Sequence, residues 1–297
     1  MISIIPAPLA GRVAIITGAS WGIGAAVAID FARRGCSHIA ITYLGNIDAA
    51  KKVLSSINEI CPDIKTALIR ADVTSEMFGQ DAVKAALSSL SVNHIDIVVS
   101  NAALSDMNIP QNMETHTKDA SDRFMTANVW SPFQLSLAAI PYMTKGERII
   151  TISSVASKRP NVSLPLTSHF GSWCFGFKLT GVLGFMILGQ PHGDLGRDKA
   201  ASDSITRVLA AAYLHQTGIT INSVAVGPTN TDALRTGMAK LPKEWTEALY
   251  ARATAERRIT EVHDVTDVVS WLAGPDSKLV NGNFVPCSGG SMLELQG

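Results

Sequence analysis

The stretch TGASWGIG, residues Thr17–Gly24, decides which fold this sequence can adopt. It follows the apolar run RVAIIT at Arg12–Thr17 and opens a helical pattern at Ile23–Arg34, which stops at Gly35. A glycine-rich turn between a strand and a helix lets the backbone turn tightly and approach a pyrophosphate, which the first N–H groups of the helix can bind. Because the glycines stand in this strand–turn–helix context, they predict a dinucleotide site rather than a purely structural turn.

Short apolar runs alternate with longer helical patterns along the whole chain. The strands that we expect are Arg12–Thr17, His38–Tyr43, Thr66–Ala71, Ile95–Ser100, Arg148–Ser153, Thr220–Val226 and Gly282–Pro286. The helices that we expect are Ile23–Arg34, Ala49–Ile60, Asp81–Leu90, Ala120–Ala139, Lys199–Gln216 and Val265–Leu272. This alternation predicts an α/β fold, a Rossmann-type doubly wound parallel sheet in three α/β/α layers. No repeat or linker divides the chain, so we expect a single domain over residues 1–297.

Composition narrows the class of protein. Lys+Arg and Asp+Glu both number 25, and without a basic excess we expect no nucleic-acid partner. The four cysteines are far apart in sequence and form no CxxC pair, which predicts buried thiols in a reducing compartment and no metal site. The first residues lack the basic and apolar regions of a secretory signal, so we expect a cytoplasmic protein.

Several motifs resemble one enzyme family in order and spacing. TGASWGIG is similar to the TGxxxGxG signature of classical short-chain dehydrogenases/reductases. Five further stretches agree with that family: ADV (Asp72), SNAAL (Asn101), NVWSPF (Asn128), TISSVAS (Ser154) and DKAASDSITRVLA (Lys199). The stretch GITINSVAVGPTNTD, which carries Thr231, looks most like fungal secondary-metabolism reductases of the family. Each match alone could be a cap, a turn residue or a helix hydrogen-bonder, but six in order point to the family.

The resemblance implies a function and a set of site residues. It implies an NAD(P)-dependent oxidoreductase that interconverts the ketone and alcohol of a small metabolite. The implied catalytic residues are Ser154, Lys199 and Asn128. The implied cofactor-binding residues are Thr17, Gly18, Ser20, Trp21, Gly22, Ile23, Gly24, Asp72, Asn101, Lys199 and Thr231. Dimers or tetramers are usual in the family through the helices near Asn128 and Lys199, so a homo-oligomer is expected.

The end of the second strand bears on the choice of nicotinamide. NAD enzymes usually place a carboxylate there for the ribose 2′-hydroxyl, whereas the run from Ile41 to Asn46 contains no acid. This absence favours NADP. A basic partner for the 2′-phosphate is not evident, because Trp21 occupies a loop position that is often basic in NADP members of the family. Arg33 and Arg34 lie at a helix end, where arginine is usually a favourable C-terminal charge.

The proton donor of the family is missing. In the family a tyrosine stands four residues before the lysine, on the same helix face, and the lysine lowers the pKa of its hydroxyl. In this chain Leu195 stands four residues before Lys199, and Tyr213 lies fourteen residues beyond it. Thr167 and Ser168 are poor substitutes, since an alcohol has no suitable pKa. We therefore expect weak or absent activity, and the alternative function is an impaired NADP-binding sensor or partner protein.

An atypical apolar stretch, residues 172–196, precedes the lysine. Without it the chain reads LTSHFGRDKAASD, and Phe170 then stands four residues before Lys199. Its boundaries can be back-translated into splice-like codons, so one hypothesis is a retained intron. The alternative is a real insertion, which would serve as a lid, a subunit contact or a membrane-touching patch. A membrane span at residues 170–189 is disfavoured, because Lys178 interrupts it and glycine recurs through it.

Residues 232–261 form a polar, helix-prone segment after the sixth expected strand. We expect this segment to be the lid that selects a small carbonyl or alcohol substrate.

Overall fold

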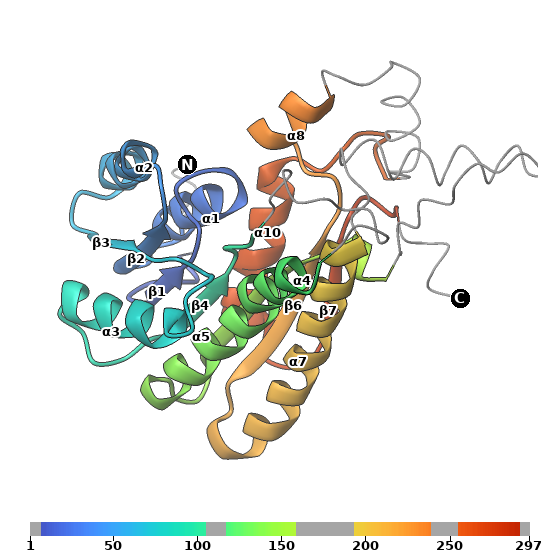
Figure 1. The fold of residues 1–297 in the computed structure, drawn as a ribbon. Coiled ribbons are helices and arrows are strands. Elements are labelled where there is room, and N and C mark those ends of the chain that lie inside the picture. The colour runs from blue at the N-terminus through green and yellow to red at the C-terminus, as the bar shows by residue number, and fades with distance from the viewer. Residues whose placement is uncertain (1–6, 105–116, 159–192, 239–254, 292–297) are drawn as a thin grey trace, which may run out of the picture.

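The computed structural model describes residues 7–104, 117–158, 193–238 and 255–291. Seven parallel strands form one sheet in the order β3-β2-β1-β4-β5-β6-β7 (Figure 1). The strands are β1 (Val13–Ile16), β2 (His38–Tyr43), β3 (Lys65–Arg70), β4 (Ile97–Ser100), β5 (Arg148–Ser154), β6 (Thr220–Val226) and β7 (Phe284–Cys287). The predicted doubly wound parallel sheet is therefore confirmed, and the strand order reverses between β1 and β4.

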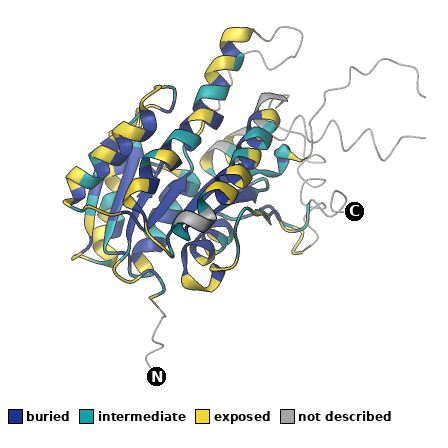
Figure 2. Cartoon of the chain, turned by 90° about the horizontal axis from the view of Figure 1, so that it is seen from below, coloured by how far each residue is buried: buried dark blue, intermediate teal, exposed yellow. Residues whose placement is uncertain are grey.

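Helices cover both faces of the sheet. They are α1 (Gly22–Arg33), α2 (Ile47–Ile60), α3 (Phe78–Leu90), α4 (Lys118–Met125), α5 (Ser131–Ala139), α7 (Gly193–Thr217), α8 (Asp232–Met238) and α10 (Val262–Ala273). The dark-blue strands in Figure 2 lie between helices whose outer faces are yellow, that is, exposed. In a parallel sheet of this kind both faces are buried, which is why the strands are nearly continuous apolar runs.

The core has two layers, one on each face of the sheet. Alternate residues of β1 show the division: Ala14 and Ile16 belong to one apolar cluster, and Val13 and Ile15 to the other. Helices α1, α2 and α10 pack on the first cluster, and α3, α5 and α7 pack on the second. This is the three-layer α/β/α arrangement expected from the alternation of strands and helices.

The expected helix at Ala120–Ala139 is interrupted in the structure. Between α4 and α5 lies one π-helical turn, Thr126–Trp130, with Asn128 at its centre. An extra residue in the turn shifts the register of the side chains that follow, and such turns are frequent at functional sites. The hydrophobic period did not predict this turn, since one inserted residue hardly changes the average period.

No helix in the described parts of the chain is both long enough and apolar enough to cross a bilayer. The expected apolar insertion, residues 172–196, falls outside the described residues except for its last four, which form the start of α7.

The contact between α3 and α5 depends on a glycine. A Cβ atom added to Gly79 would lie 2.5 Å from the backbone of Gln134 and Leu135. We expect Gly79→Ala to destabilise the protein by about 1–3 kcal/mol, because the clash outweighs the better helix propensity of alanine. Urea unfolding measures this change. Gly45→Ala is the control, since its Cβ would meet nothing within 4 Å. An equal effect of the two substitutions would contradict the argument.

Candidate active site

The glycine-rich turn is fixed to the two neighbouring strands by hydrogen bonds. The amide of Gly18 donates to Thr42 Oγ1 at 3.0 Å, which joins the turn to β2. Asn101, just after β4, donates from Nδ2 to the carbonyl oxygens of Thr17 and Gly18 at 2.9 and 3.0 Å. Gly24 must lack a side chain for this contact, because a Cβ atom there would lie 2.5 Å from Asn101 Nδ2. The turn is thus held in one shape at the carboxyl ends of β1 and β4.

Thr17 contributes to this arrangement from inside the protein. Its side chain is fully buried, and its Oγ1 accepts hydrogen bonds from the amides of Asn101 and Ala102, both at 3.0 Å. Thr17 therefore ties the end of β1 to the segment after β4 and does not line the pocket described next.

A pocket of about 550 Å³ opens beside the turn, at the carboxyl ends of β1, β2 and β4. Its described lining residues are Gly18, Ser20, Trp21, Gly22, Ile23, Thr42, Tyr43, Leu44, Gly45, Asn46, Ala49, Ala71, Val73, Asn101, Ala102, Ala103 and Thr231. None of these side chains carries a charge at neutral pH. The place matches the rule for open α/β sheets, in which ligands bind where the strand order reverses.

The pocket fits the diphosphate of a dinucleotide. The N-terminus of α1 faces it through Gly22 and Ile23, and the N-cap residue Trp21 makes no capping hydrogen bond with its side chain. The first amides of the helix are therefore free to bind an anion. Gly22 has φ +61°, and a Cβ atom added to it would meet nothing nearer than Thr231 Cγ2 at 3.8 Å. A glycine here leaves room for a ligand against the backbone.

The predicted cofactor-binding residues fall into two groups. Seven of them line the pocket: Gly18, Ser20, Trp21, Gly22, Ile23, Asn101 and Thr231. Four do not: Thr17, Gly24, Asp72 and Lys199. Asp72 lies between the lining residues Ala71 and Val73, but its Oδ1 accepts hydrogen bonds from the amide and the hydroxyl of Thr74 at 2.9 and 2.8 Å.

Asn128 is held at the centre of the π-helical turn. Its side chain accepts from the amide of Leu104 at 2.8 Å and donates to the carbonyl of Leu104 at 3.2 Å. Its Nδ2 also donates to Asp198 Oδ2 at 3.3 Å. Asp198 is fully buried and immediately precedes Lys199 on α7, so this contact brings two of the predicted catalytic residues together.

Lys199 lies beside the strand that carries Ser154. Its Nζ donates to the carbonyl of Ile152 at 2.7 Å, two residues before Ser154 on β5. Burial lowers the pKa of Lys199 to about 8, although the charges of Asp203 and Asp198 act to raise it. Ser154 Oγ accepts from the amide of Ala156 at 3.2 Å. The three predicted catalytic residues therefore lie around α7, β5 and the π-helical turn.

The start of α7 shows which residue lies one helical turn before Lys199, where the family has its tyrosine. The helix begins at Gly193, so Leu195 lies one turn before Lys199, as expected from the sequence. A Cβ atom added to Gly196 would lie 2.9 Å from the carbonyl oxygen of Ala156, so this position requires a glycine. Both alignments supply one, Gly196 in the full chain and Gly171 after deletion of residues 172–196. The described tyrosines lie elsewhere, on β2, at Tyr142 and in the second half of α7.

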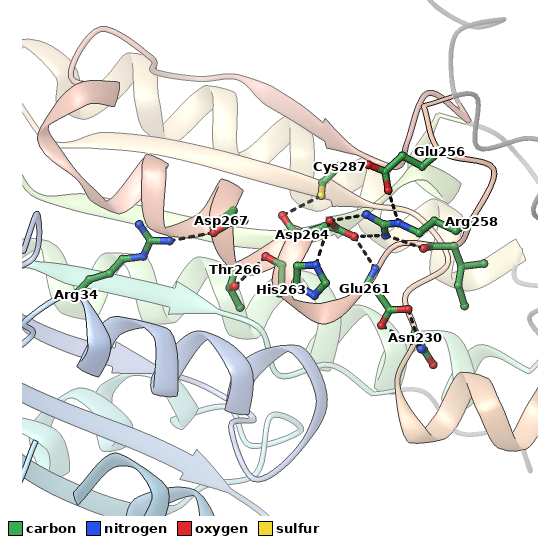
Figure 3. Close-up of polar contacts among 11 residues, drawn as sticks. Arg34, Asn230, Glu256, Arg258, Glu261, His263, Asp264, Thr266, Asp267 and Cys287 are labelled. Atoms are coloured by element: carbon green, nitrogen blue, oxygen red, sulfur yellow. Dashed lines mark hydrogen bonds and ion pairs between the residues drawn. The ribbon is translucent and has the colours of Figure 1, made fainter. Parts of the chain in front are cut away.

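Polar contacts anchor the turn that carries Thr231 (Figure 3). Asn230 Nδ2 donates to both carboxylate oxygens of Glu261 at 2.9 and 3.0 Å, and its amide donates to the Thr260 carbonyl at 2.7 Å. Arg258 pairs with Asp264 through two hydrogen bonds of 2.5 and 2.9 Å, which hold the pKa of Asp264 below its usual value. Both ends of the expected lid, residues 232–261, are therefore anchored close to the pocket.

Comparison with known proteins agrees with this geometry. The family model described as short chain dehydrogenase matches residues 12–168, and the one described as enoyl-(acyl carrier protein) reductase matches residues 183–292. The short chain dehydrogenase penD of Penicillium thymicola is 33% identical, over 97% of this chain and 95% of that protein. The chain belongs to the short-chain dehydrogenase/reductase family. Members of this family are oxidoreductases that act on carbonyl and alcohol groups.

Other relatives in the family extend the comparison. The hydroxynaphthalene reductase-like protein Arp2 of Metarhizium acridum is 30% identical, over 97% of each chain. The reductase LugOII, described as catalysing a keto-reduction in lugdunomycin biosynthesis, superposes with a TM-score of 0.77 at 27% identity, over 96% of this chain and 99% of its own. A short-chain dehydrogenase of Burkholderia cenocepacia J2315 in complex with NADP gives 0.74 at 26% identity, with the same coverage.

Sequence reasoning missed some residues of this family site. The sequence points to the Leu44–Asn46 wall only through its lack of an acid, and to Asp198 only as part of the lysine motif. A signal for Asp198 was present, since a carboxylate directly before a predicted catalytic lysine is an ionisable group in the site. The contacts of Asn230 with Glu261 join residues 31 positions apart, and no local pattern indicates them.

Burial of the Lys199 charge predicts a pH-dependent stability. Between pH 8 and 10.5 the unfolded chain keeps a proton that the folded protein releases, so the Lys199 contribution to stability rises with pH there. We expect Lys199→Met to raise the free energy of unfolding at pH 7 by up to about 3 kcal/mol, an advantage that shrinks by about 2 kcal/mol at pH 9.5. Urea unfolding at both pH values measures it. A gain that is the same at both pH values would show that the buried charge is not its cause.

Proposed function

We propose that the protein is an NADP(H)-dependent oxidoreductase that interconverts the ketone and alcohol of a small metabolite. The observation that carries the proposal is the convergence of Ser154, Lys199 and Asn128 around α7, next to the pocket that fits a dinucleotide. The keto-reduction named for LugOII and the reductase name of Arp2 support this reaction class. The biosynthetic role named for LugOII also supports a role in secondary metabolism. We propose a location in the reducing cytoplasm from the dispersed cysteines alone.

In the proposed reduction, Ser154, Lys199 and Asn128 have different roles. If NADPH were held by the pocket residues at the N-terminus of α1, it would supply a hydride to the carbonyl carbon. The carbonyl oxygen would then take its proton from water, because Leu195 has none to donate. The hydroxyl of Ser154 orients the carbonyl oxygen and stabilises the charge that develops on it. Lys199 places a positive charge at the end of β5, and Asn128, held by Leu104, keeps the π-helical turn against α7. We propose that the predicted lid, residues 232–261, selects the substrate; its residues 239–254 lie outside the described part of the chain.

The preference for NADP over NAD rests on the end of β2. The described pocket wall there consists of Tyr43, Leu44, Gly45 and Asn46, with no carboxylate to accept from a ribose 2′-hydroxyl. The NADP complex of the Burkholderia relative supports the same cofactor.

A second candidate function is favoured by one position. Leu195 lies one turn before Lys199 on α7, where the family has its tyrosine, and leucine has no proton to donate. The protein would then bind NADP(H) as a sensor or assembly partner without turnover. Titration of the cofactor followed by an assay of NADPH oxidation over a ketone panel separates the two functions.

The apolar stretch at residues 172–196 remains part of the proposal. The two family models leave residues 169–182 unmatched, which supports an interruption of the family pattern there. We propose a retained intron as the first explanation and a genuine insertion over the substrate mouth as the second. Sequencing the mature transcript across codons 165–200 distinguishes them, because an intron would be absent from the message. An oligomer formed through α5 and α7 is proposed on the family habit alone.

Restoring a tyrosine tests both the reaction and the alignment. We expect Leu195→Tyr in the full chain, or Phe170→Tyr in the chain lacking residues 172–196, to raise NADPH oxidation by about 100-fold, in the range of general acid catalysis. The variant that responds shows which register is right. Adding Lys199→Ala should abolish the gain. If neither tyrosine variant oxidises NADPH with any ketone while both bind it, the enzymatic proposal is wrong and the sensor function stands.

A further inference from the structure

Arg70 contacts one wall of the pocket through the carbonyl of Leu44, although no motif indicates it. It is the last residue of β3 and pairs in register with Tyr43, the last residue of β2. The pairing of β3 with β2 therefore places Arg70 beside the turn Leu44–Asn46, which forms one wall of the pocket. Arg70 and Leu44 are 26 residues apart in sequence.

The side chain of Arg70 is directed to that wall and keeps most of its donors available. It is exposed, and its Nε donates to the carbonyl oxygen of Leu44 at 3.3 Å. Within the described segments it makes no ion pair with any carboxylate. A guanidinium group has five N–H donors, so the single bond to Leu44 orients the group and leaves the others for an anion.

The other charged groups near this wall do not compete with Arg70. Asp72 is engaged by Thr74, and Asp48, on the first turn of α2, does not line the pocket. Arg34, one of the arginines considered from the sequence, pairs with Asp30 at 2.6 Å and with Asp267 at 2.9 Å (Figure 3 shows the second pair). It follows the C-terminal end of α1, whereas the pocket lies at the N-terminal end. Trp21 supplies no charge at the loop position where a base is common.

We infer that Arg70 is the residue that recognises the adenosine 2′-phosphate and so sets the preference for NADP(H). A nucleotide whose diphosphate lies at the N-terminus of α1 directs its adenosine ribose toward the end of β2, where NAD enzymes place their carboxylate. Arg70, on the neighbouring strand β3, is bonded to the carbonyl of Leu44 just after the end of β2, so its guanidinium group lies near that position. A planar guanidinium suits a phosphate through paired, charge-assisted hydrogen bonds. This inference rests on the proposed NADP-dependent function.

Calorimetric titration of the purified full chain tests the inference without any turnover. The ligands are NADPH, NADH and 2′,5′-ADP, and the variants are Arg70→Met and Arg70→Lys. We expect Arg70→Met to weaken NADPH and 2′,5′-ADP by about 10- to 100-fold, as the loss of a charge-assisted contact implies, and to leave NADH within about twofold. Arg70→Lys should recover part of the loss, since it keeps the charge but not the fork.

Two comparisons keep the result unambiguous. Arg207→Met removes an exposed arginine from α7, away from the pocket, and should change none of the affinities. Damage to the Leu44–Asn46 wall would weaken NADPH and NADH alike, because that wall lines the pocket for both. A wild-type preference for NADPH that survives Arg70→Met overturns the inference and leaves the proposed function intact. A wild-type chain that binds neither nucleotide, or that prefers NADH, overturns the NADP proposal and the inference together.

Discussion

The close approach of the glycine-rich turn to the end of β4 is the constraint on which the rest of the structure depends. Asn101 donates to the carbonyl oxygens of Thr17 and Gly18, and Thr17 accepts from the amides that follow β4. The two bonds from Asn101 Nδ2 require a glycine at position 24, because a Cβ atom there would lie 2.5 Å from that nitrogen. They hold the first turn of α1 at the point where the strand order reverses, which is where a parallel α/β sheet has an open crevice.

The catalytic part of the candidate site depends on charged side chains that are buried along α7. α7 carries Asp198, Lys199 and Asp203 into the protein interior, where each buried charge is costly unless it is compensated. Lys199 is held by the carbonyl of Ile152, and Asn128 approaches Asp198 from the π-helical turn. Burial of the Lys199 ammonium group lowers its pKa, which disfavours its charged form. Ionisable groups with perturbed pKa values cluster at functional sites. Lys199 therefore matches the family's catalytic lysine, whereas Leu195, one helical turn before it, cannot donate the proton that the family reaction needs.

Much of the fold could be predicted from the sequence, for identifiable reasons. The strands His38–Tyr43 and Thr220–Val226 were predicted with the bounds that the structure shows, because each is an apolar, β-branched run between clear turns. Seven of the predicted cofactor-binding residues line the pocket: those of the glycine-rich turn were predicted from its strand–turn–helix context, and Asn101 and Thr231 from the family resemblance. The π-helical turn at Asn128 was missed, since hydrophobic periodicity is insensitive to one inserted residue. Arg70 was missed because only the pairing of β3 with β2 brings it to the turn after β2. A local sequence motif cannot indicate such a contact, because strand pairing joins residues that are far apart in the sequence.

Hydrogen–deuterium exchange with and without NADPH tests the central claim most directly, because it reports on the turn itself. If the amides at the start of α1 bind the diphosphate, saturating NADPH should slow exchange in a peptide covering Thr17–Gly24, with a change of similar sign in the Leu44–Asn46 wall. The outer helix face around Arg207 should exchange at the same rate in both states. NADPH bound at saturation without any slowing in Thr17–Gly24, or no binding at millimolar concentration, would contradict the account.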